Sequence, residues 1–182
     1  CGRWRIRQAP DEPQTLLAER EGAWIGIVCG RQIRCETGLA VPALGTLQEF
    51  PDGRTLGETI QEVQASGALA CLPWGFGKWT GSRGKLVQRA LDVNTPKTLT
   101  VCDNGGRLQA LGLPLLIREA ARRGFKVLPG TDPFPLGDDY QRTGGFGFFA
   151  KMPGQQHPWQ DLRSWLEAQD GSPDFYGTAL GL

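Results

Sequence analysis

The sequence predicts an α/β protein with mostly parallel strands, because short apolar segments alternate with helical segments along most of the chain. A second observation is that unusual polar residues directly follow three of the predicted strands. The carboxyl ends of parallel strands lie at one edge, where ligands bind in open sheets and in barrels alike. The residues alone leave an open sheet and a barrel as alternatives.

The first predicted element is a short helix at residues 13–21. It is followed by a continuous apolar run at 23–30, which has the length of a strand and ends in glycine, as a buried strand does. Another strand is expected at 39–47, although Pro42 argues against a central place for it in a sheet.

A capping-box pattern at Thr55 and Glu58 predicts a helix that begins at Leu56, and Gly67 supplies its C-terminal cap. Beyond this helix, strands and helices alternate as they do in βαβ units. Strands are predicted at 68–72, 98–102 and 125–128, and helices at 85–91, 114–123 and 158–171.

The composition fits one soluble globular domain. The chain has 182 residues, of which 40% are hydrophobic and 21% charged, so residues 1–182 are assigned to a single domain, with a C-terminal helix and tail at 151–182. The net charge of +1 does not indicate a nucleic-acid partner, so any attraction for anions has to be local. No apolar run approaches the roughly 20 residues that span a bilayer.

The five cysteines follow no metal-ligand spacing, and reduced structural thiols are expected, which favours a cytoplasmic location. The chain begins with Cys1 rather than methionine. Three interpretations are open: a fragment of a longer protein, a processed product, or a mature lipoprotein anchored through a lipidated Cys1.

The loop CLPWGFGKWTGSRGK follows the strand at 68–72 and contains no carboxylate. Trp74 and Trp79 are expected either to line a ligand pocket or to close the end of the core. Three cations, Lys78, Arg83 and Lys85, lie around a predicted helix start, where free N–H groups attract anions. The alternative is a solvated basic loop.

The next two strands also end in polar residues. Asp103, Asn104 and Arg107 follow one of them, either as ligand contacts or as an Asx turn closed by an Asp103–Arg107 ion pair. Thr131 and Asp132 follow the other. Asp103 and Asp132 are expected to face each other, and two such carboxylates can bind a hard cation or act as a general acid/base pair.

His157 is the only histidine, and a capping or surface role is favoured over a catalytic one. A multi-histidine metal site is therefore excluded within this chain. No serine or cysteine nucleophile is recognisable beside a base, so the patterns of nucleophilic catalysis are not indicated.

The segment GRQIRCETGLAVPALGT, residues 30–46, is similar to the glycine–x–glutamate strand and the following leucine–glycine strand of the polymerase and histidinol phosphatase (PHP) superfamily. Residues 130–134 resemble its late Gly-Ser-Asp-Ala-His motif, and Leu72-Pro73 stands where it has a His-Pro pair. The resemblance covers residues 22–135. It implies a partial or distorted (β/α) barrel and metal-dependent phosphoesterase chemistry.

The chain departs from that pattern at three ligand positions, where Gln32 replaces a glutamate and Leu72 and Phe134 replace histidines. Asp132 alone matches a metal ligand by type. The superfamily's first histidine motifs have no counterpart here, which favours the fragment interpretation of Cys1, with N-terminal barrel elements missing. The resemblance thus implies a divalent metal only if upstream residues complete its site.

These observations predict a PHP-like domain that binds a small, phosphorylated anion at the carboxyl rim of the strands and has lost most of the metal ligands. The predicted ligand-binding residues are Trp74, Lys78, Trp79, Arg83, Asn104, Arg107 and Thr131; the predicted catalytic pair is Asp103 and Asp132, and Asp132 is also the candidate metal ligand. An active phosphoester hydrolase completed by upstream ligands is the alternative. A structural interaction module is a third class, which requires an exposed apolar patch.

Overall fold

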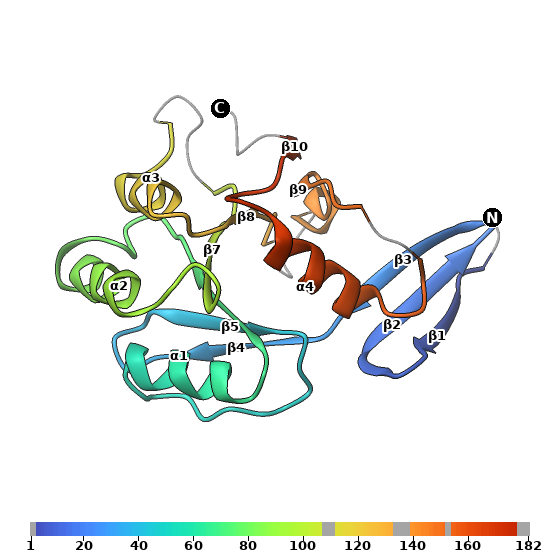
Figure 1. Ribbon diagram of the computed structural model, residues 1–182, viewed down its shortest axis with the longest axis horizontal. Coiled ribbons are helices and arrows are strands. Elements are labelled where there is room, and N and C mark those ends of the chain that lie inside the picture. Colours follow the sequence, from blue (N-terminus) through green and yellow to red (C-terminus); the bar gives the residue numbers. More distant parts are fainter. Residues whose placement is uncertain (1–2, 107–111, 133–138, 152–153, 178–182) are drawn as a thin grey trace.

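The computed structural model describes residues 3–106, 112–132, 139–151 and 154–177 (Figure 1). Its strands form three open sheets, with the orders β1-β2-β3, β4-β5-β6-β7-β8 and β10-β9. Most of the strand pairs are antiparallel, and none of the described strands closes a barrel. The predicted barrel of mostly parallel strands is therefore wrong, because the strand pairs formed by residues 5–44 are antiparallel and have no helix between their strands.

The three-stranded sheet consists of β1 (Arg5–Ala9), β2 (Glu12–Arg20) and β3 (Ala23–Val28). The helix predicted at 13–21 is wrong, since these residues form β2. Glu21 and Gly22 both have positive φ, at 52° and 84°, and a two-residue turn of this kind joins antiparallel strands with matching twist. The turn returns the chain onto β2, and this pairing outweighs the local helix propensity of leucine, alanine and glutamate.

The apolar strand predicted at 23–30 is present as β3, but its surroundings differ from the expectation. It is an edge strand of an antiparallel sheet, and Ile25 and Ile27 are exposed. The opposite face of this sheet carries the buried Leu17 and packs on the C-terminal helix. A continuous apolar run therefore marks a strand here without marking its burial.

The five-stranded sheet contains β4 (Gly30–Arg34), β5 (Ala40–Leu44), β6 (Leu69–Pro73), β7 (Leu99–Asp103) and β8 (Val127–Pro129). β4, β5 and β6 pair antiparallel, whereas β6, β7 and β8 pair parallel, as the βαβ pattern predicted. Pro42 lies opposite Gln32 of β4, while β5 meets β6 only at Ala43 and Leu44. The proline therefore stands outside the short stretch in which β5 is paired on both sides.

Three helices cover one face of this sheet: α1 (Leu56–Ala65), α2 (Gly81–Val93) and α3 (Leu115–Arg122). Ile60, Val87 and Ile117 of these helices share a buried core with Leu72 and Val101 of the strands. On the chain's C-terminal side follow a 3-10 turn η2 (Asp139–Arg142), β9 (Phe146–Phe148), α4 (Pro158–Ala168) and β10 (Phe175–Gly177). None of the described helices is long and apolar enough to cross a membrane.

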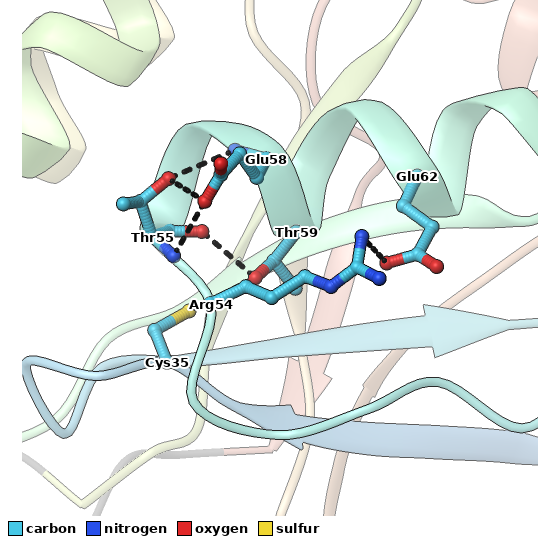
Figure 2. Close-up of polar contacts among 6 residues, drawn as sticks. All are labelled: Cys35, Arg54, Thr55, Glu58, Thr59 and Glu62. Carbon is cyan, nitrogen blue, oxygen red and sulfur yellow. Dashed lines mark hydrogen bonds and ion pairs between the residues drawn. The ribbon is translucent and has the colours of Figure 1, made fainter.

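The start of α1 confirms the predicted capping box (Figure 2). The Glu58 N–H donates to the Thr55 hydroxyl at 3.3 Å, and the Thr55 N–H donates to the Glu58 carboxylate at 3.0 Å. The Thr59 hydroxyl donates to the Thr55 carbonyl, and Arg54 pairs with Glu62 at 3.1 Å one turn farther along. The helix therefore begins where the sequence predicted because its free N–H groups have local acceptors.

Candidate functional site at the carboxyl ends of β6, β7 and β8

The loop after β6 is tied to the neighbouring strand from its first residue. The Trp74 N–H donates to the Cys102 carbonyl at 2.8 Å, which extends the β6–β7 pairing by one bond. Trp74 and Trp79 are only 8% and 7% exposed and belong to the main core cluster. Both indoles close the end of the core, and neither presents an open ring face to a ligand.

The exposed aromatic ring of this loop is Phe76, at 79% exposure, which the sequence reasoning did not single out. Its signal was present, because Phe76 stands between Gly75 and Gly77 at the tip of the loop. Lys78 is exposed, and its aliphatic stem lies over Gly75: a Cβ added there would come within 2.8 Å of the Lys78 Cδ. The glycine thus lets the lysine fold back over the loop.

Helix α2 begins directly after this loop and has an open N-terminus. Thr80 occupies the N-cap position without a side-chain capping bond, and the first turn carries no acidic residue. Instead, the Arg83 guanidinium donates to the Gly77 carbonyl at 3.2 Å, and Lys85 is exposed one residue beyond the first turn. Because α2 returns the chain from β6 to β7, this N-terminus lies on the side where the parallel strands end.

At the end of β7, Asp103 is buried, with 2% of its surface exposed. Its carboxylate accepts a hydrogen bond from the Gly105 N–H at 3.0 Å, as in an Asx turn, and its carbonyl accepts from the Gly130 N–H at 2.9 Å. Asp103 therefore links the loops that follow β7 and β8. Arg107, its predicted ion-pair partner, lies outside the described residues.

The loops after β7 and β8 also meet through their side chains. The Asn104 amide donates to the Asp132 carboxylate at 3.4 Å, and its oxygen accepts from the Gly106 N–H at 3.0 Å. Asp132 is exposed and has a φ of 38°, a left-handed conformation that few residues other than glycine, asparagine and aspartate adopt readily. Thr131 beside it is half-buried. Predicted site residues from two strand ends are therefore brought together.

The pKa of the Cys102 thiol depends in part on the negative charges at this edge of the sheet. Its hydrogen bond with Cys71, its burial and the negative charges of Asp132 and Asp103 together raise the pKa of Cys102 well above its ordinary value. The two carboxylates at the carboxyl ends of β7 and β8 contribute less to this rise than the Cys71 hydrogen bond and burial do. The described cysteines are free thiols, and Cys71 also shares a hydrogen bond of 2.9 Å with the Thr100 hydroxyl.

The metal-ligand positions implied by the PHP resemblance are scattered. Gln32 is exposed on β4, Leu72 is buried in the core, and Phe134 lies outside the described residues. Within the described ranges, no three histidine, cysteine, aspartate or glutamate side chains are grouped so that they could hold one metal ion. His157 stands at the N-cap of α4 and makes no side-chain capping bond there.

Comparison with known proteins identified no relative of this chain. No family model matches the chain, and no curated protein or solved structure is significantly similar to it. The resemblance to the PHP superfamily therefore stays a prediction.

Proposed function

We propose that the chain binds a small anionic molecule, phosphorylated in its natural form, in the loops at the carboxyl ends of β6, β7 and β8. The observation that carries this proposal is the N-terminus of α2, where a helix without a side-chain cap is surrounded by cations. Lys78, Arg83 and Lys85 lie within eight positions of one another, with no acidic residue in the first turn.

This arrangement of positive charges is unfavourable until an anion binds. The N-terminus of a helix carries a partial positive charge, so a nearby cation costs about 0.3–1 kcal/mol where an acidic residue would stabilise. A phosphate group would accept hydrogen bonds from the free N–H groups and pair with Lys78 and Arg83. The glycines of the loop allow the ligand to approach the backbone closely.

The neighbouring loops would supply the remaining contacts. Asn104 and Thr131 offer an amide and a hydroxyl beside the strand ends, and the exposed Phe76 ring offers an apolar surface for the uncharged part of a ligand. Trp74 and Trp79 would act as the floor of the site by packing beneath the loop. Recognition would then depend on charge and shape.

Hydrolysis of a phosphoester at the same place is the second candidate. The contact between Asn104 and Asp132 supports it, since it holds an exposed carboxylate beside the loop that begins at Asp103. In this reading Asp103 and Asp132 would do acid/base work or hold one divalent cation, with Asp132 as the metal ligand. Metal analysis of the purified protein separates the candidates: stoichiometric manganese, iron or zinc would favour the hydrolase.

The test of anion binding is thermal unfolding in the presence of inorganic phosphate and pyrophosphate. Both compounds should raise the Tm of the wild-type protein, because ligands that bind only the folded state stabilise it. Lys78→Gln and Arg83→Gln should reduce this rise. Arg89→Gln is the matched control, since Arg89 is an exposed cation on the same helix but near its other end.

The proposal fails if Lys78→Gln and Arg83→Gln keep the full phosphate response. It also fails if pyrophosphate leaves the wild-type Tm unchanged at millimolar concentration. If Arg89→Gln reduces the phosphate-dependent rise in Tm as much as the two site variants do, the effect comes from overall charge. That result would also contradict a local site.

A further inference from the structure

A buried lysine stands at the opposite end of the parallel strands. Lys126 immediately precedes β8 and is only 7% exposed. Its carbonyl accepts a hydrogen bond from the Val101 N–H at 2.9 Å, which fixes the backbone beside β7. By strand alternation its side chain shares a face with Leu128, on the side of the sheet away from the main core cluster.

A small cavity opens at this place between the sheet and α4. Its walls include Leu69, Thr100 and Lys126 from the sheet side and Arg163, Leu166 and Glu167 from α4, with Lys97 at its edge. The cavity has a volume of about 20 Å³, which is room for about one water-sized group. It lies at the amino ends of β6 and β7, opposite the edge that carries the loops described above.

The charges around this cavity do not balance. Arg163 and Glu167 pair with each other at 3.0 Å, and Arg163 also donates to the Gly67 carbonyl, so these two groups are satisfied. The side chains of Lys126 and Lys97 make no hydrogen bond or ion pair with any residue in the described part of the chain. Two positive charges are therefore left without a counter-charge.

An ammonium group at this depth needs an acceptor, because burying an unpaired charge is costly. Among the described residues, the fully inaccessible polar atoms without a partner belong to Thr15, Thr37 and His157. The Lys126 ammonium is not one of them, so it retains contact with the open space of the cavity. A lysine whose stem is buried and whose ammonium remains accessible beside a small cavity can hold an anion there.

We infer that this cavity is a second anion site, which holds a compact inorganic anion between Lys126 and Lys97. Chloride fits the cavity whole, and one oxygen of phosphate or sulfate fits with the rest of the ion at the mouth. The Thr100 hydroxyl lines the same cavity but is already engaged, donating to the Ala70 carbonyl at 3.2 Å. The lysines therefore provide the attraction, and this inference does not rest on the site proposed above.

The experiment is thermal unfolding at constant ionic strength while chloride replaces gluconate, a larger anion that the cavity excludes, with a second series in phosphate. The wild-type Tm should rise by about 2–4 °C once the free anion concentration reaches roughly five times the Kd. Lys126→Met should show no rise. Its Tm in gluconate should equal or exceed that of the wild type, because methionine fills the space without a buried charge.

Three control variants make the result specific. Lys78→Gln and Arg83→Gln should keep the chloride response, since both positions lie at the other end of the strands. Arg89→Gln should also keep it. If the wild-type Tm does not depend on the anion, or if Lys126→Met responds as the wild type does, the inference is overturned and an ordered water solvates Lys126 instead.

Lys97→Gln covers the case in which Lys126→Met does not fold, because Lys97 is exposed and its replacement leaves the core intact. This variant should need a several-fold higher chloride concentration for half of the Tm rise. An unchanged midpoint would overturn the inference. Crystals grown in bromide provide the direct check, and an anomalous peak beside the Lys126 ammonium is expected. If bromide is bound elsewhere in such crystals but not in this cavity, the site is contradicted.

Discussion

One contact in the described structure joins β2 to the distant helix α4, and it allows a quantitative prediction. Glu12 of β2 is fully buried, and its carboxylate accepts hydrogen bonds from the Trp159 N–H at 3.0 Å and the Gln160 N–H at 2.8 Å. These N–H groups belong to the first turn of α4, whose N-cap residue makes no side-chain bond. Glu12 thus caps a helix that lies about 150 positions away in sequence.

The cost of changing Glu12 follows from the number of bonds and their charge. Hydrogen bonds to a charged acceptor contribute about 1.5–3 kcal/mol each. Glu12→Gln keeps one carbonyl oxygen and the shape of the side chain, so it should lose one bond and the favourable interaction with the helix dipole, about 2–3 kcal/mol in all. Glu12→Ala leaves both N–H groups without an acceptor and should cost about 3–5 kcal/mol.

The assay is urea unfolding followed by the fluorescence of the chain's six tryptophans, one of which, Trp159, lies in the affected turn. In a chain of this size each kcal/mol should also lower the Tm by about 2–4 °C. Asp11→Asn is the matched control: Asp11 is an exposed neighbour with a φ of 58°, which asparagine adopts readily. Equal losses for Glu12→Ala and Asp11→Asn would refute the reasoning, as would Glu12→Gln being neutral.

Two other positions give further predictions. Thr55→Ala should lower the Tm by about 2–4 °C, since it removes the N-cap of α1. The hydrogen bonds from the Thr55 side chain and backbone hold the pKa of Glu58 below its ordinary value, so their contribution is present at neutral pH and is lost as the pH falls below the ordinary range for glutamate. The Tm difference between the wild type and Thr55→Ala should therefore narrow in acid without vanishing, because the Glu58 N–H still donates to the Thr55 hydroxyl there. Gly45→Ala should destabilise by about 2–4 kcal/mol, because its φ is 77° and an added Cβ would overlap the Trp159 ring. Gly53 has a φ of 87° and open space around it, so Gly53→Ala should lower the free energy of unfolding only through backbone strain. If Gly45→Ala and Gly53→Ala are equally destabilised in urea, the overlap with Trp159 is contradicted.

The elements from α1 to β8 were predictable because they carry local signals, whereas β9, η2 and β10 had no counterpart in the sequence prediction. The capping box at Thr55 fixed the start of α1, and β6, β7 and β8 are short apolar runs between helices with clear ends. β1 and β2 were not predictable from the same signals. Residues 13–21 have the composition of a helix, and only their pairing with β1 and β3 makes them a strand. Burial of Leu17 and exposure of Leu16 show the alternation that helix propensity concealed.

The sequence predicted the location of the candidate site better than it predicted which residues line it. Parallel strands bring their carboxyl ends together in an open sheet as in a barrel. Asp103 and Asp132 therefore lie at one edge, where the loops after β7 and β8 are hydrogen-bonded to each other, although the described strands form no barrel. The role of an aromatic residue depends on packing instead. Trp74 and Phe76 are two positions apart, yet one is buried and the other is the most exposed apolar ring of the loop. Sequence cannot separate them, because the loop conformation decides which ring meets the core.

The two cationic places at opposite ends of the strands should act independently of each other. A five-residue strand such as β6 or β7 spans about 16 Å, which exceeds the Debye length of about 8–10 Å at physiological salt. An anion at Lys126 therefore contributes little to the potential at Lys78, and the packed sheet between them offers no charged relay among the core residues. Stabilisation by an anion at each end should consequently add, as it does for distant sites without shared partners. Combining Lys126→Met with Lys78→Gln should lower the anion-dependent rise in Tm by the sum of the two separate reductions. A non-additive result would mean that a single anion site, reached by rearrangement of the loops, accounts for both responses.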